Sequence, residues 1–368
     1  MFTVSSTNSN NDGYDFEFPV ARGPYWKVLR PGYNYFTVLR ISTSPAIQYV
    51  LLMDTGSSVT FIQCFPCDLC YNQIAPIFDP KQSLTYKVKY CADFEYKRSI
   101  CTGGCNERGE CAYSSHYGDG SYSRGVIAEE ISRFGRKDDI VMNLTFGCAH
   151  NSNGSFNGSD GILGLGRGKL SFPSQIERKF GFKKFSYCLM DRSETEPSIY
   201  STLRFGPDVL DPQNDVVYTP MIQNPKSPSH YFINLTGISV AGKLIPVHTS
   251  LPNGMLVDSG SILTWFPTII YEDVRDSFHD AALRLGWNPL DMVSAPEVAL
   301  HFDGDDKPVV KLRTQNVVVN LPGMNVYCLA FLPSKSEGLG VLGNQQQQGI
   351  RVVYDNLQSA IGFDPLSC

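Results

Sequence analysis

The chain has 368 residues, of which 42% are hydrophobic and 18% are charged, and its formal net charge at pH 7 is −5. This length and composition allow a large buried core divided over two or three units. The modest negative charge, with no cluster of Lys and Arg, excludes the electrostatic footprint of nucleic-acid binding, and no apolar run approaches the length of a membrane span. The 32 Gly and 23 Pro residues favour many short strands and turns over long surface helices.

The predicted elements begin after a polar segment, residues 1–23, that is rich in Asn, Ser and Gly and is expected to be disordered. Residues 35–41 and 47–53 then read as paired strands around a Ser-Thr-Ser-Pro turn. A dense cysteine region and further strands follow, up to residue 146. Residues 172–180 are predicted to form a short helix.

The polar, proline-containing stretch 208–214 is the expected boundary between an N-terminal lobe, residues 24–212, and a C-terminal lobe, residues 213–368. The second lobe starts with a strand-like run, residues 231–240. Apolar residues then recur at helical spacing, which predicts one amphipathic helix with these residues in the core: Tyr271, Val274, Phe278, Ala282 and Leu285. The remainder reads mainly as strands: 309–312, 317–319, 326–331 and 350–354.

A short phrase occurs twice, as Asp54-Thr55-Gly56-Ser57 and as Asp258-Ser259-Gly260-Ser261. Each copy follows an apolar, strand-like run, and each is followed downstream by two apolar residues and a glycine, Ile162-Leu163-Gly164 and Val341-Leu342-Gly343. Two Asp side chains in contact cannot both ionise easily, so one serves as base and the other as acid. The duplication predicts two half-molecules that each bring one carboxylate to a shared cleft, and hydrolysis by that carboxylate pair.

The alternative for each phrase is an ordinary turn. Asp bonds its own backbone and Gly supplies positive φ, so a single Asp-Thr-Gly is weak evidence for a site. Two copies in the same context are much harder to explain as turns alone.

At these residues the chain resembles the pepsin-like aspartic proteases, and most of all the plant nepenthesin-type group, from about Tyr33 to the C-terminus. Further phrases carry the resemblance: Tyr117-Gly118-Asp119-Gly120-Ser121, the run 160–168, Phe185-Ser186-Tyr187-Cys188-Leu189, Leu263-Thr264-Trp265-Phe266-Pro267, Gly343-Asn344-Gln345-Gln346-Gln347 and Ile361-Gly362-Phe363. The resemblance implies an all-β fold, mainly β with a few short helices, in which two similar lobes enclose a cleft.

The resemblance maps Asp54 and Asp258 onto the family's catalytic pair, which activates a water that attacks the peptide carbonyl. It implies that Gly56 and Gly260 donate their N–H groups to the carboxylates. Thr55 and Ser259 resemble the hydroxyls that tie the two loops together, and Ser57 and Ser261 those that bond the outer carboxylate oxygens. An ordinary turn cap remains the alternative for these four hydroxyl residues. No cofactor or metal is expected.

The phrase that starts at Tyr117 reads as a hairpin tip between strand-like segments. In the family this hairpin is a flap that closes over the substrate, so Tyr117 and Gly118 are expected to lie over the site; simple packing of a turn is the alternative for Tyr117. Phe61 stands where the family usually has a Trp whose N–H supports the flap Tyr, and a phenyl ring cannot donate. The Gln345–Gln348 run is expected to be a polar turn and strand start without a function.

Eleven cysteines indicate an oxidising compartment. The run Cys64-x-x-Cys67-x-x-Cys70 could also be read as metal ligands, but no fourth ligand stands at suitable spacing. The nepenthesin-type pattern implies five bridges, the last of which would join the lobes: Cys64–Cys67, Cys70–Cys148, Cys91–Cys111, Cys101–Cys105 and Cys188–Cys368. Cys328 is left over in an apolar strand, so we expect a buried, unreactive thiol.

Four Asn-x-Ser/Thr triplets are candidate glycosylation sites and also point to secretion: Asn143, Asn153, Asn157 and Asn234. The first 16 residues carry no apolar signal core, and we expect a leader and the family's inhibitory prosegment to be missing from this sequence. The expected location is therefore secreted or vacuolar.

The sequence favours an aspartic endopeptidase that works in acid on polypeptide substrates, as a monomer without nucleic-acid or membrane partners. The alternative is a binding protein on the same fold, like the cereal xylanase inhibitors, which typically lose part of the dyad or its supports. Both Asp residues, both glycines and Tyr117 are present here, which favours the enzyme.

Overall fold

The protein is described by a computed structural model that covers residues 16–22, 34–41, 46–95, 100–134, 140–156, 158–191, 201–207, 209, 216–247, 251–289, 295–321, 326–334, 338–365 and 368. Its contacts divide the chain into two compact units. Unit 1 comprises Met1–Lys183 and Thr202–Pro207, and unit 2 comprises Lys184–Ser201 and Asp208–Cys368. The boundary expected between residues 212 and 213 lies outside the described residues.

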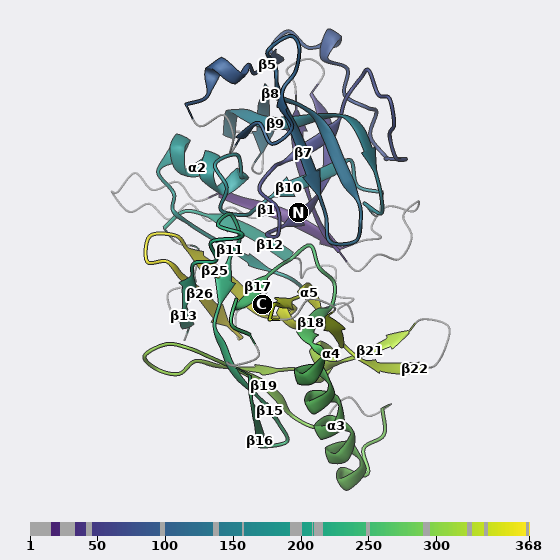
Figure 1. The fold of residues 1–368 in the computed structure, drawn as a ribbon, viewed down its shortest axis with the longest axis vertical. Coiled ribbons are helices and arrows are strands. Elements are labelled where there is room, and N and C mark those ends of the chain that lie inside the picture. The colour runs from purple at the N-terminus through teal and green to yellow at the C-terminus, as the bar shows by residue number, and fades with distance from the viewer. Residues whose placement is uncertain are drawn as a thin grey trace. The chain divides into compact units, whose positions relative to one another are not determined.

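Unit 1 is built almost entirely from strands (Figure 1). Its strands are β1 (Phe16–Arg22), β2 (Tyr35–Ile41), β3 (Ile47–Asp54), β4 (Phe61–Gln63), β5 (Lys87–Val88), β6 (Gly104–Cys105), β7 (Cys111–His116), β8 (Tyr122–Phe134), β9 (Ile140–Asn153), β10 (Gly161–Gly164) and β12 (Ser201–Phe205). Two short 3-10 turns, Pro80–Gln82 and Cys91–Asp93, and helix α2 (Phe172–Phe180) complete it.

The core of unit 1 forms because strands with alternating apolar residues pair in register. β2 and β3 pair antiparallel, as predicted, and β7, β8 and β9 form a meander of antiparallel strands. Their apolar side chains meet in one cluster with those of β4 and β10. Helix α2 begins at Ser171, whose hydroxyl accepts from the Ser174 N–H (3.3 Å), and ends at Gly181 (φ 79°), as start and stop signals of this kind predict.

Unit 2 is also mainly β but carries the longest helix, α3 (Thr268–Leu285). Its strands are β11 (Lys184–Cys188), β13 (Val217–Ile222), β14 (Phe232–Ile233), β15 (Leu235–Val240), β16 (Lys243–Pro246), β17 (Met255–Val257), β18 (Thr264–Pro267), β19 (Val298–Phe302), β20 (Val309–Leu312), β21 (Val318–Leu321), β22 (Val326–Leu329), β23 (Phe331–Ser334), β24 (Gly340–Leu342), β25 (Arg351–Asp355) and β26 (Ala360–Asp364). Two one-turn helices, α4 (Thr314–Val317) and α5 (Asn344–Gln347), lie between strands.

The helix α3 packs its apolar face against β15, β16, β18 and β23 (Figure 1). Its buried residues are Ile270, Val274, Ser277, Phe278 and Ala281. The expectation that Leu285 lies in the core is wrong: its side chain is 61% exposed, because the helix ends there, at Gly286 (φ 60°), beyond the sheet it covers.

Two other expectations about local structure are wrong. The segment 1–23 contains a strand, β1, because Phe16–Arg22 finds partners for its backbone in β2 and β12; residues 1–15 and 23 lie outside the described part of the chain. The run Gln345–Gln348 was expected to be a polar turn and strand start, but Gln345–Gln347 belong to a one-turn helix, α5, and the next strand starts at Arg351.

The mainly β architecture predicted from the sequence is confirmed, with two units in which strands dominate. None of the helices in the described ranges is long and apolar enough to cross a bilayer.

Candidate active site

Asp54 is the last residue of β3 and begins the first of the two repeated loops. The Gly56 N–H donates to its Oδ1 (2.8 Å), as predicted, and the Leu165 N–H donates to its backbone carbonyl (2.7 Å). The side chain of Asp54 is buried, with 6% of its surface exposed. The carboxylate is therefore held by a short Asx-type turn directly at the end of a core strand.

Strand β10 holds this loop from beside it. It runs parallel to β3, with Gly164 opposite Asp54, and the Gly164 N–H donates to the Thr60 hydroxyl (3.1 Å). A Cβ at Gly164 would lie 2.8 Å from backbone atoms of Val59, so only glycine allows this approach. The apolar-apolar-Gly phrase downstream of Asp54 is thus the support of the Asp54 loop.

Asp258 follows β17 and begins the second loop, in unit 2. Its Oδ1 accepts from the N–H groups of Gly260 (2.8 Å) and Ser261 (3.2 Å), and its Oδ2 accepts from the Ser261 hydroxyl (2.7 Å). The side chain of Asp258 is half-buried. Three donors inside one turn hold this carboxylate in a fixed orientation.

Unit 2 supports its loop in the same way as unit 1. Strand β24 runs parallel to β17, with Leu342 opposite Val257, and the Gly343 N–H donates to the Thr264 hydroxyl (3.0 Å). A Cβ at Gly343 would lie 2.4 Å from the carbonyl oxygen of Leu263. Each unit therefore repeats the whole device: strand, Asp loop, threonine hydroxyl and close-packed glycine.

The four predicted supporting hydroxyls do not all have the expected partners. Thr55 and Ser259 are fully buried directly after their aspartates, and Ser261 bonds the outer oxygen of Asp258 as predicted. The corresponding expectation for Ser57 is wrong, because its buried hydroxyl makes no hydrogen bond to Asp54. Ser57 contributes its backbone carbonyl, which accepts from the Gly166 N–H (2.8 Å).

The predicted flap is a tight hairpin between β7 and β8. The Tyr117 N–H donates to the Ser121 carbonyl (2.9 Å) and the Gly120 N–H to the Tyr117 carbonyl (3.0 Å), while Asp119 accepts from both the N–H and the hydroxyl of Ser121. Tyr117 is half-buried and Gly118 is exposed at the tip. Burial and the neighbouring Tyr113 and Asp54 raise the pKa of Tyr117 well above its ordinary value, so the Tyr117 hydroxyl stays protonated beside Asp54.

Phe61 contacts the flap as part of an aromatic cluster. Its fully buried ring lies 5.4 Å from that of Phe156 and 6.4 Å from that of Tyr117, and the Phe156 ring meets Tyr117 edge-on at 5.6 Å and stacks on Tyr71 at 4.5 Å. Edge-on and stacked rings are favoured arrangements. Packing in this cluster therefore holds Tyr117 where the family's Trp would hold it by a hydrogen bond.

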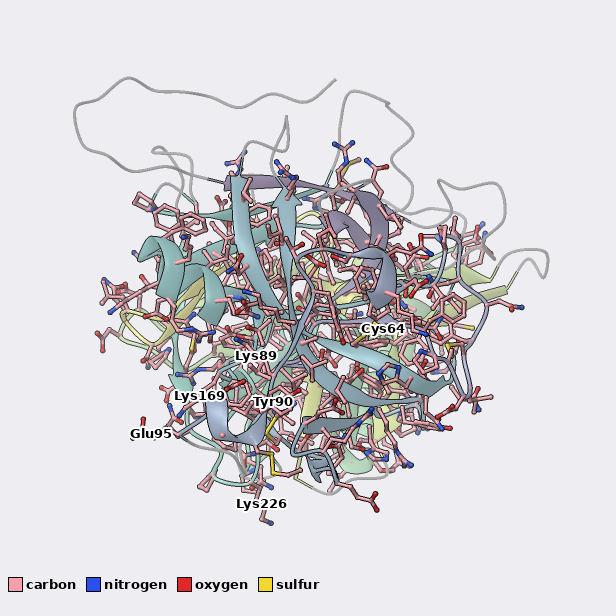
Figure 2. The ribbon with its side chains drawn as sticks, turned by 90° about the horizontal axis from the view of Figure 1, so that it is seen from above. Cys64, Lys89, Tyr90, Glu95, Lys169 and Lys226 are labelled. Carbon is pink, nitrogen blue, oxygen red and sulfur yellow. A yellow bond between two sulfur atoms is a disulfide. The ribbon has the colours of Figure 1, made fainter. Side chains whose placement is uncertain are left out.

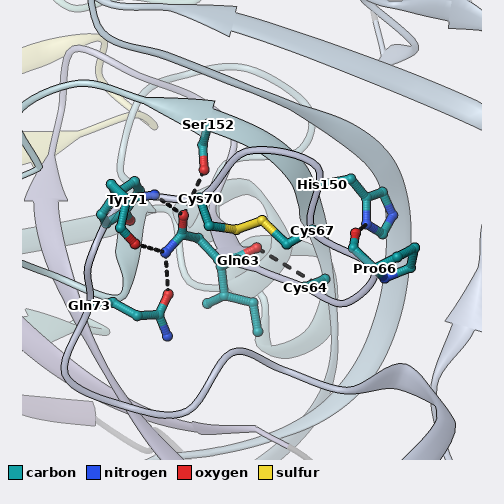
Figure 3. The surroundings of a disulfide bond; sticks show 10 residues. Gln63, Cys64, Pro66, Cys67, Cys70, Tyr71, Gln73, His150 and Ser152 are labelled. Atoms are coloured by element: carbon teal, nitrogen blue, oxygen red, sulfur yellow. Dashed lines mark hydrogen bonds between the residues drawn. A yellow bond between two sulfur atoms is a disulfide. The ribbon is translucent and has the colours of Figure 1, made fainter.

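The first two predicted disulfides are wrong. The structure bridges Cys64 to Cys148, with a Cα separation of 5.4 Å. It bridges Cys67 to Cys70, with a Cα separation of 6.1 Å (Figure 3). The reason is the parallel pairing of β4 with β9, in which the Cys64 N–H donates to the Ala149 carbonyl (2.8 Å) and brings Cys64 next to Cys148. Because all three cysteines of the first cluster are bridged, none offers a thiolate to a metal.

The next two predicted disulfides are also wrong. The structure bridges Cys91 to Cys105 and Cys101 to Cys111, with Cα separations of 6.0 and 5.0 Å. The four sulfurs are close together: Cys105 stands directly opposite Cys111 in the β6–β7 pair, and the sulfurs of Cys91 and Cys101 are 3.7 Å apart. Geometry within this group decides the partners, and spacing along the sequence does not reveal it. Disulfides appear as yellow bonds among the side chains in Figure 2.

The predicted Cys188–Cys368 bridge is confirmed, with a Cα separation of 5.5 Å. Both cysteines belong to unit 2, so the expectation that this bridge joins the two lobes is wrong. Cys328 is free, as predicted, but half-buried where a buried side chain was expected. It lies on β22, which pairs with β21 in a two-stranded sheet.

The four glycosylation triplets differ in exposure. Asn143 and Asn153 are exposed on β9, whereas Asn234 is half-buried and its amide donates to Asp303 (3.4 Å). Asn157 lies outside the described residues. The exposed pair, Asn143 and Asn153, are the better placed acceptors, and glycosylation itself stays a prediction.

The sequence analysis missed Thr60 and Thr264 as supports of the two loops. Each stands six residues after its aspartate, so extending the comparison of the two repeated phrases to that position would have found them. It also assigned no role to the glutamine run, whose Gln347 contacts the Asp258 loop.

The chain is similar to known proteins in sequence. Family models described as Xylanase inhibitor N-terminal and C-terminal match residues 35–207 and residues 230–293 and 288–365. "Aspartyl protease family protein 2" of Arabidopsis thaliana is 38% identical over 91% of this chain and 71% of its own length, and "Aspartic proteinase nepenthesin-2" of Nepenthes gracilis is 33% identical over 91% and 78%.

Among solved structures, the one described as "Crystal structure of edgp" superposes with a TM-score of 0.74 at 21% identity, covering 95% of this chain and 94% of that one. At that identity the likeness concerns the fold alone. The sequence relatives and the family models, which together span most of the chain, carry the assignment: the chain belongs to the plant pepsin-like aspartic protease family.

Proposed function

We propose that the protein is an aspartic endopeptidase that hydrolyses peptide bonds in acid, with Asp54 and Asp258 as its catalytic pair. The observation that supports this most is the repetition of one device in both units. In each, an Asp at the end of a core strand accepts the N–H of the glycine two residues on, and a glycine packed against the loop donates to a threonine hydroxyl. Two carboxylates presented alike are what a dyad requires.

The proposed reaction uses one ionised and one protonated carboxyl group. The ionised Asp takes a proton from water while the oxygen of that water bonds to the peptide carbonyl carbon, and the protonated Asp donates to the carbonyl oxygen. The C–N bond then breaks as a proton passes to the leaving nitrogen. Thr55 and Ser259, buried beside the two aspartates, are proposed to tie the loops together.

The flap is proposed to cover the substrate. Tyr117 stays neutral beside Asp54. Its packing against Phe61 and Phe156 holds the hairpin in position. A neutral hydroxyl at the edge of the site can bond the substrate, and the hairpin can exclude water when a substrate lies beneath it.

The pH dependence follows from the shared proton. Raising the pH removes this proton and leaves two carboxylates with no acid, so activity should peak in acid and fade toward neutrality. Casein digestion at pH 4 and pH 7, with and without pepstatin, tests the proposal. We expect pepstatin-sensitive cleavage at pH 4 that is at least tenfold faster than at pH 7. Equal rates at both pH values, or cleavage indifferent to pepstatin, would contradict it.

The second candidate function is a non-catalytic binding protein, because the matching family models are those named for xylanase inhibitors. Complete Asp-Thr-Gly and Asp-Ser-Gly loops and the flap Tyr117 speak against it. In the same assays, no proteolysis at any pH together with inhibition of a xylanase would favour this alternative.

The compartment and partners are part of the proposal. Five disulfides need an oxidising environment, which fits a secreted or vacuolar protein. The proposed partners are polypeptide substrates, and we propose that the protein works as a monomer because both carboxylates come from one chain.

A further inference from the structure

The glutamine run after β24 forms a buried polar helix directly behind the Asp258 loop. Each side chain from Gln345 to Gln348 is at most 3% exposed. A buried carboxamide is costly unless its donors and acceptors are satisfied. The partners of these four amides therefore show what the helix is fixed to.

Gln347 bonds the backbone of Asp258 and that of the neighbouring strand β24. Its Nε2 donates to the Leu342 carbonyl (2.8 Å) and to the carbonyl of Asp258 itself (3.4 Å). The same Leu342 carbonyl also accepts the Asp258 N–H (3.0 Å). One side-chain amide thus bonds the Asp258 carbonyl directly and shares the Leu342 carbonyl with the Asp258 N–H.

Unit 1 does the corresponding task with its backbone. There the Leu165 N–H donates to the Asp54 carbonyl (2.7 Å). The equivalent residue of unit 2, Asn344, directs its N–H to the Ser261 carbonyl instead (2.7 Å), three residues farther along the loop. The Gln347 amide donates where a backbone N–H donates in unit 1.

A second pair of side chains fixes the orientation of this amide. The Tyr187 hydroxyl donates to Gln347 Oε1 and lies 2.9 Å from the Tyr354 hydroxyl, and both tyrosines are fully buried. Because Oε1 is occupied by a hydroxyl donor, the NH₂ group must face the two carbonyls. Strands β11 and β25, which carry Tyr187 and Tyr354, are thereby linked to the loop that carries Asp258.

We propose that Gln347 is a positioning residue that holds the backbone of Asp258 so that its carboxylate keeps a fixed place in the active site. The catalytic consequence rests on the proposed protease function; the structural one does not. Gln347 touches no reacting atom, and its effect on the reaction passes through Asp258.

Two variants at Gln347 and a matched control test the proposal. Gln347→Met keeps the shape but loses both donors, and we expect kcat to fall about tenfold with KM unchanged. Gln348→Met is the control. That side chain is equally buried on the same segment, but its amide donates to Gln345 (3.4 Å), away from Asp258. We expect kcat of this control to stay within twofold of the parent.

Gln347→Glu should change the pH dependence of activity, which would not change if Gln347 only filled space. A protonated Glu can still donate one hydrogen bond to a carbonyl, whereas an ionised Glu offers no donor and faces two carbonyl oxygens. The activity of this variant should therefore fall at lower pH than that of the parent. An unchanged pH profile would overturn the proposal.

Hydrogen exchange measures the structural claim without relying on activity. In Gln347→Met, amides of the segment 258–263 should exchange at least tenfold faster than in Gln348→Met. Equal exchange and equal kcat in the two Met variants would overturn the inference. A parent protein without pepstatin-sensitive cleavage would instead overturn the proposed function, and the exchange experiment would still decide the role of Gln347.

Discussion

Backbone N–H groups fix the loop after Asp54 in unit 1 and the loop after Asp258 in unit 2, and unit 2 adds side-chain donors of its own. Leu165 and Gly166 donate their N–H groups to the first loop. In the second, the Ser261 hydroxyl bonds the carboxylate and the Gln347 amide bonds the backbone. Both loops keep the glycine–threonine hydrogen bond. The repeat thus conserves the presentation of the carboxylate between the units and leaves the remaining supports free to differ.

The surroundings of the loops differ in the same way. Unit 1 contains four disulfides and unit 2 contains one. Before the apolar-apolar-Gly strand, unit 1 has the buried Asp160 where unit 2 has Leu339. Unit 1 therefore has more covalent bridges and the buried Asp160 behind its loop, and unit 2 has the buried carboxamides of its glutamine run behind the other.

Among substitutions that probe the difference between the units, the largest loss of stability is expected at Asp160. Its fully buried carboxylate accepts from the N–H groups of Val50 (2.7 Å), Ala75 (2.8 Å) and Ile74 (3.1 Å). An Asn has one acceptor oxygen, so Asp160→Asn loses at least one of these bonds and should lower the free energy of unfolding by about 2 kcal/mol. Calorimetry measures this, with Leu339→Asn in unit 2, a half-buried position, as the milder control.

The pH dependence of that cost has a definite sign. Burial raises the pKa of Asp160 above 3.8, although the three N–H donors partly offset it. A folded-state pKa above the unfolded one means that this group stabilises the fold below the unfolded pKa and loses that contribution as pH rises through the folded pKa. The cost of Asp160→Asn should thus be greatest near pH 3 and shrink toward neutrality. A cost that grows toward neutrality would show that the hydrogen bonds outweigh burial.

The next effect separates two aromatic residues at equivalent places, Phe61 in unit 1 and Trp265 in unit 2. Phe61 is fully buried against Phe156 and Tyr117, whereas Trp265 is 38% exposed. Phe61→Trp overfills the flap cluster and should cost about 1–2 kcal/mol of stability, while Trp265→Phe should cost about 0.5 kcal/mol or less. Thermal unfolding and kcat/KM check both. A gain in kcat/KM for Phe61→Trp would show that the flap gains more from a donor than it loses from crowding.

A smaller effect concerns the two serines after the glycines. Ser261→Ala removes a donor from the Asp258 carboxylate and should lower kcat about fivefold, the equivalent of about 1 kcal/mol. Ser57→Ala removes a hydroxyl that makes no bond to Asp54 and should leave kcat within about twofold. Steady-state kinetics at one acid pH decides, and equal losses in the two variants would mean that the loops are held alike.

The smallest effect is expected at Cys328. Its thiol is free and half-buried, so one thiol per native chain should react with a disulfide reagent without denaturant. Cys328→Ser should change the free energy of unfolding by about 0.5 kcal/mol or less. Absence of a reactive native thiol, or a second one, would contradict the disulfide assignment.

Many elements of the fold could be predicted from the sequence, because hydrophobic periodicity and the residues that start and stop helices and turns are local signals. Short stretches of sequence were enough to predict the strands β2 and β3, the helices α2 and α3 and the flap hairpin. The two Asp phrases could be recognised because they are repeated. The Gly56 and Gly260 donors follow from the same turns.

The rest depends on contacts between distant segments. Which cysteine meets Cys64 depends on the pairing of β4 with β9, and the burial of Gln347 depends on Tyr187, far away in the sequence. A glutamine run is polar by composition and reads as surface, and only the packed structure supplies the partners that let it lie inside. Hydrogen bonds between a buried side chain and distant segments of the chain cannot be recognised from the sequence around that side chain.

The central proposal is that Asp54 and Asp258 act together as one catalytic pair. Cleavage of a peptide substrate at pH 4 by Asp54→Asn, Asp258→Asn and the double variant tests it most directly, with circular dichroism to confirm that each variant is folded. Members of a pair that share a proton are not additive. The account predicts that each single variant loses activity by about 10³-fold or more and that the double variant is no slower than either. A single variant that keeps a substantial fraction of the parent rate would contradict it.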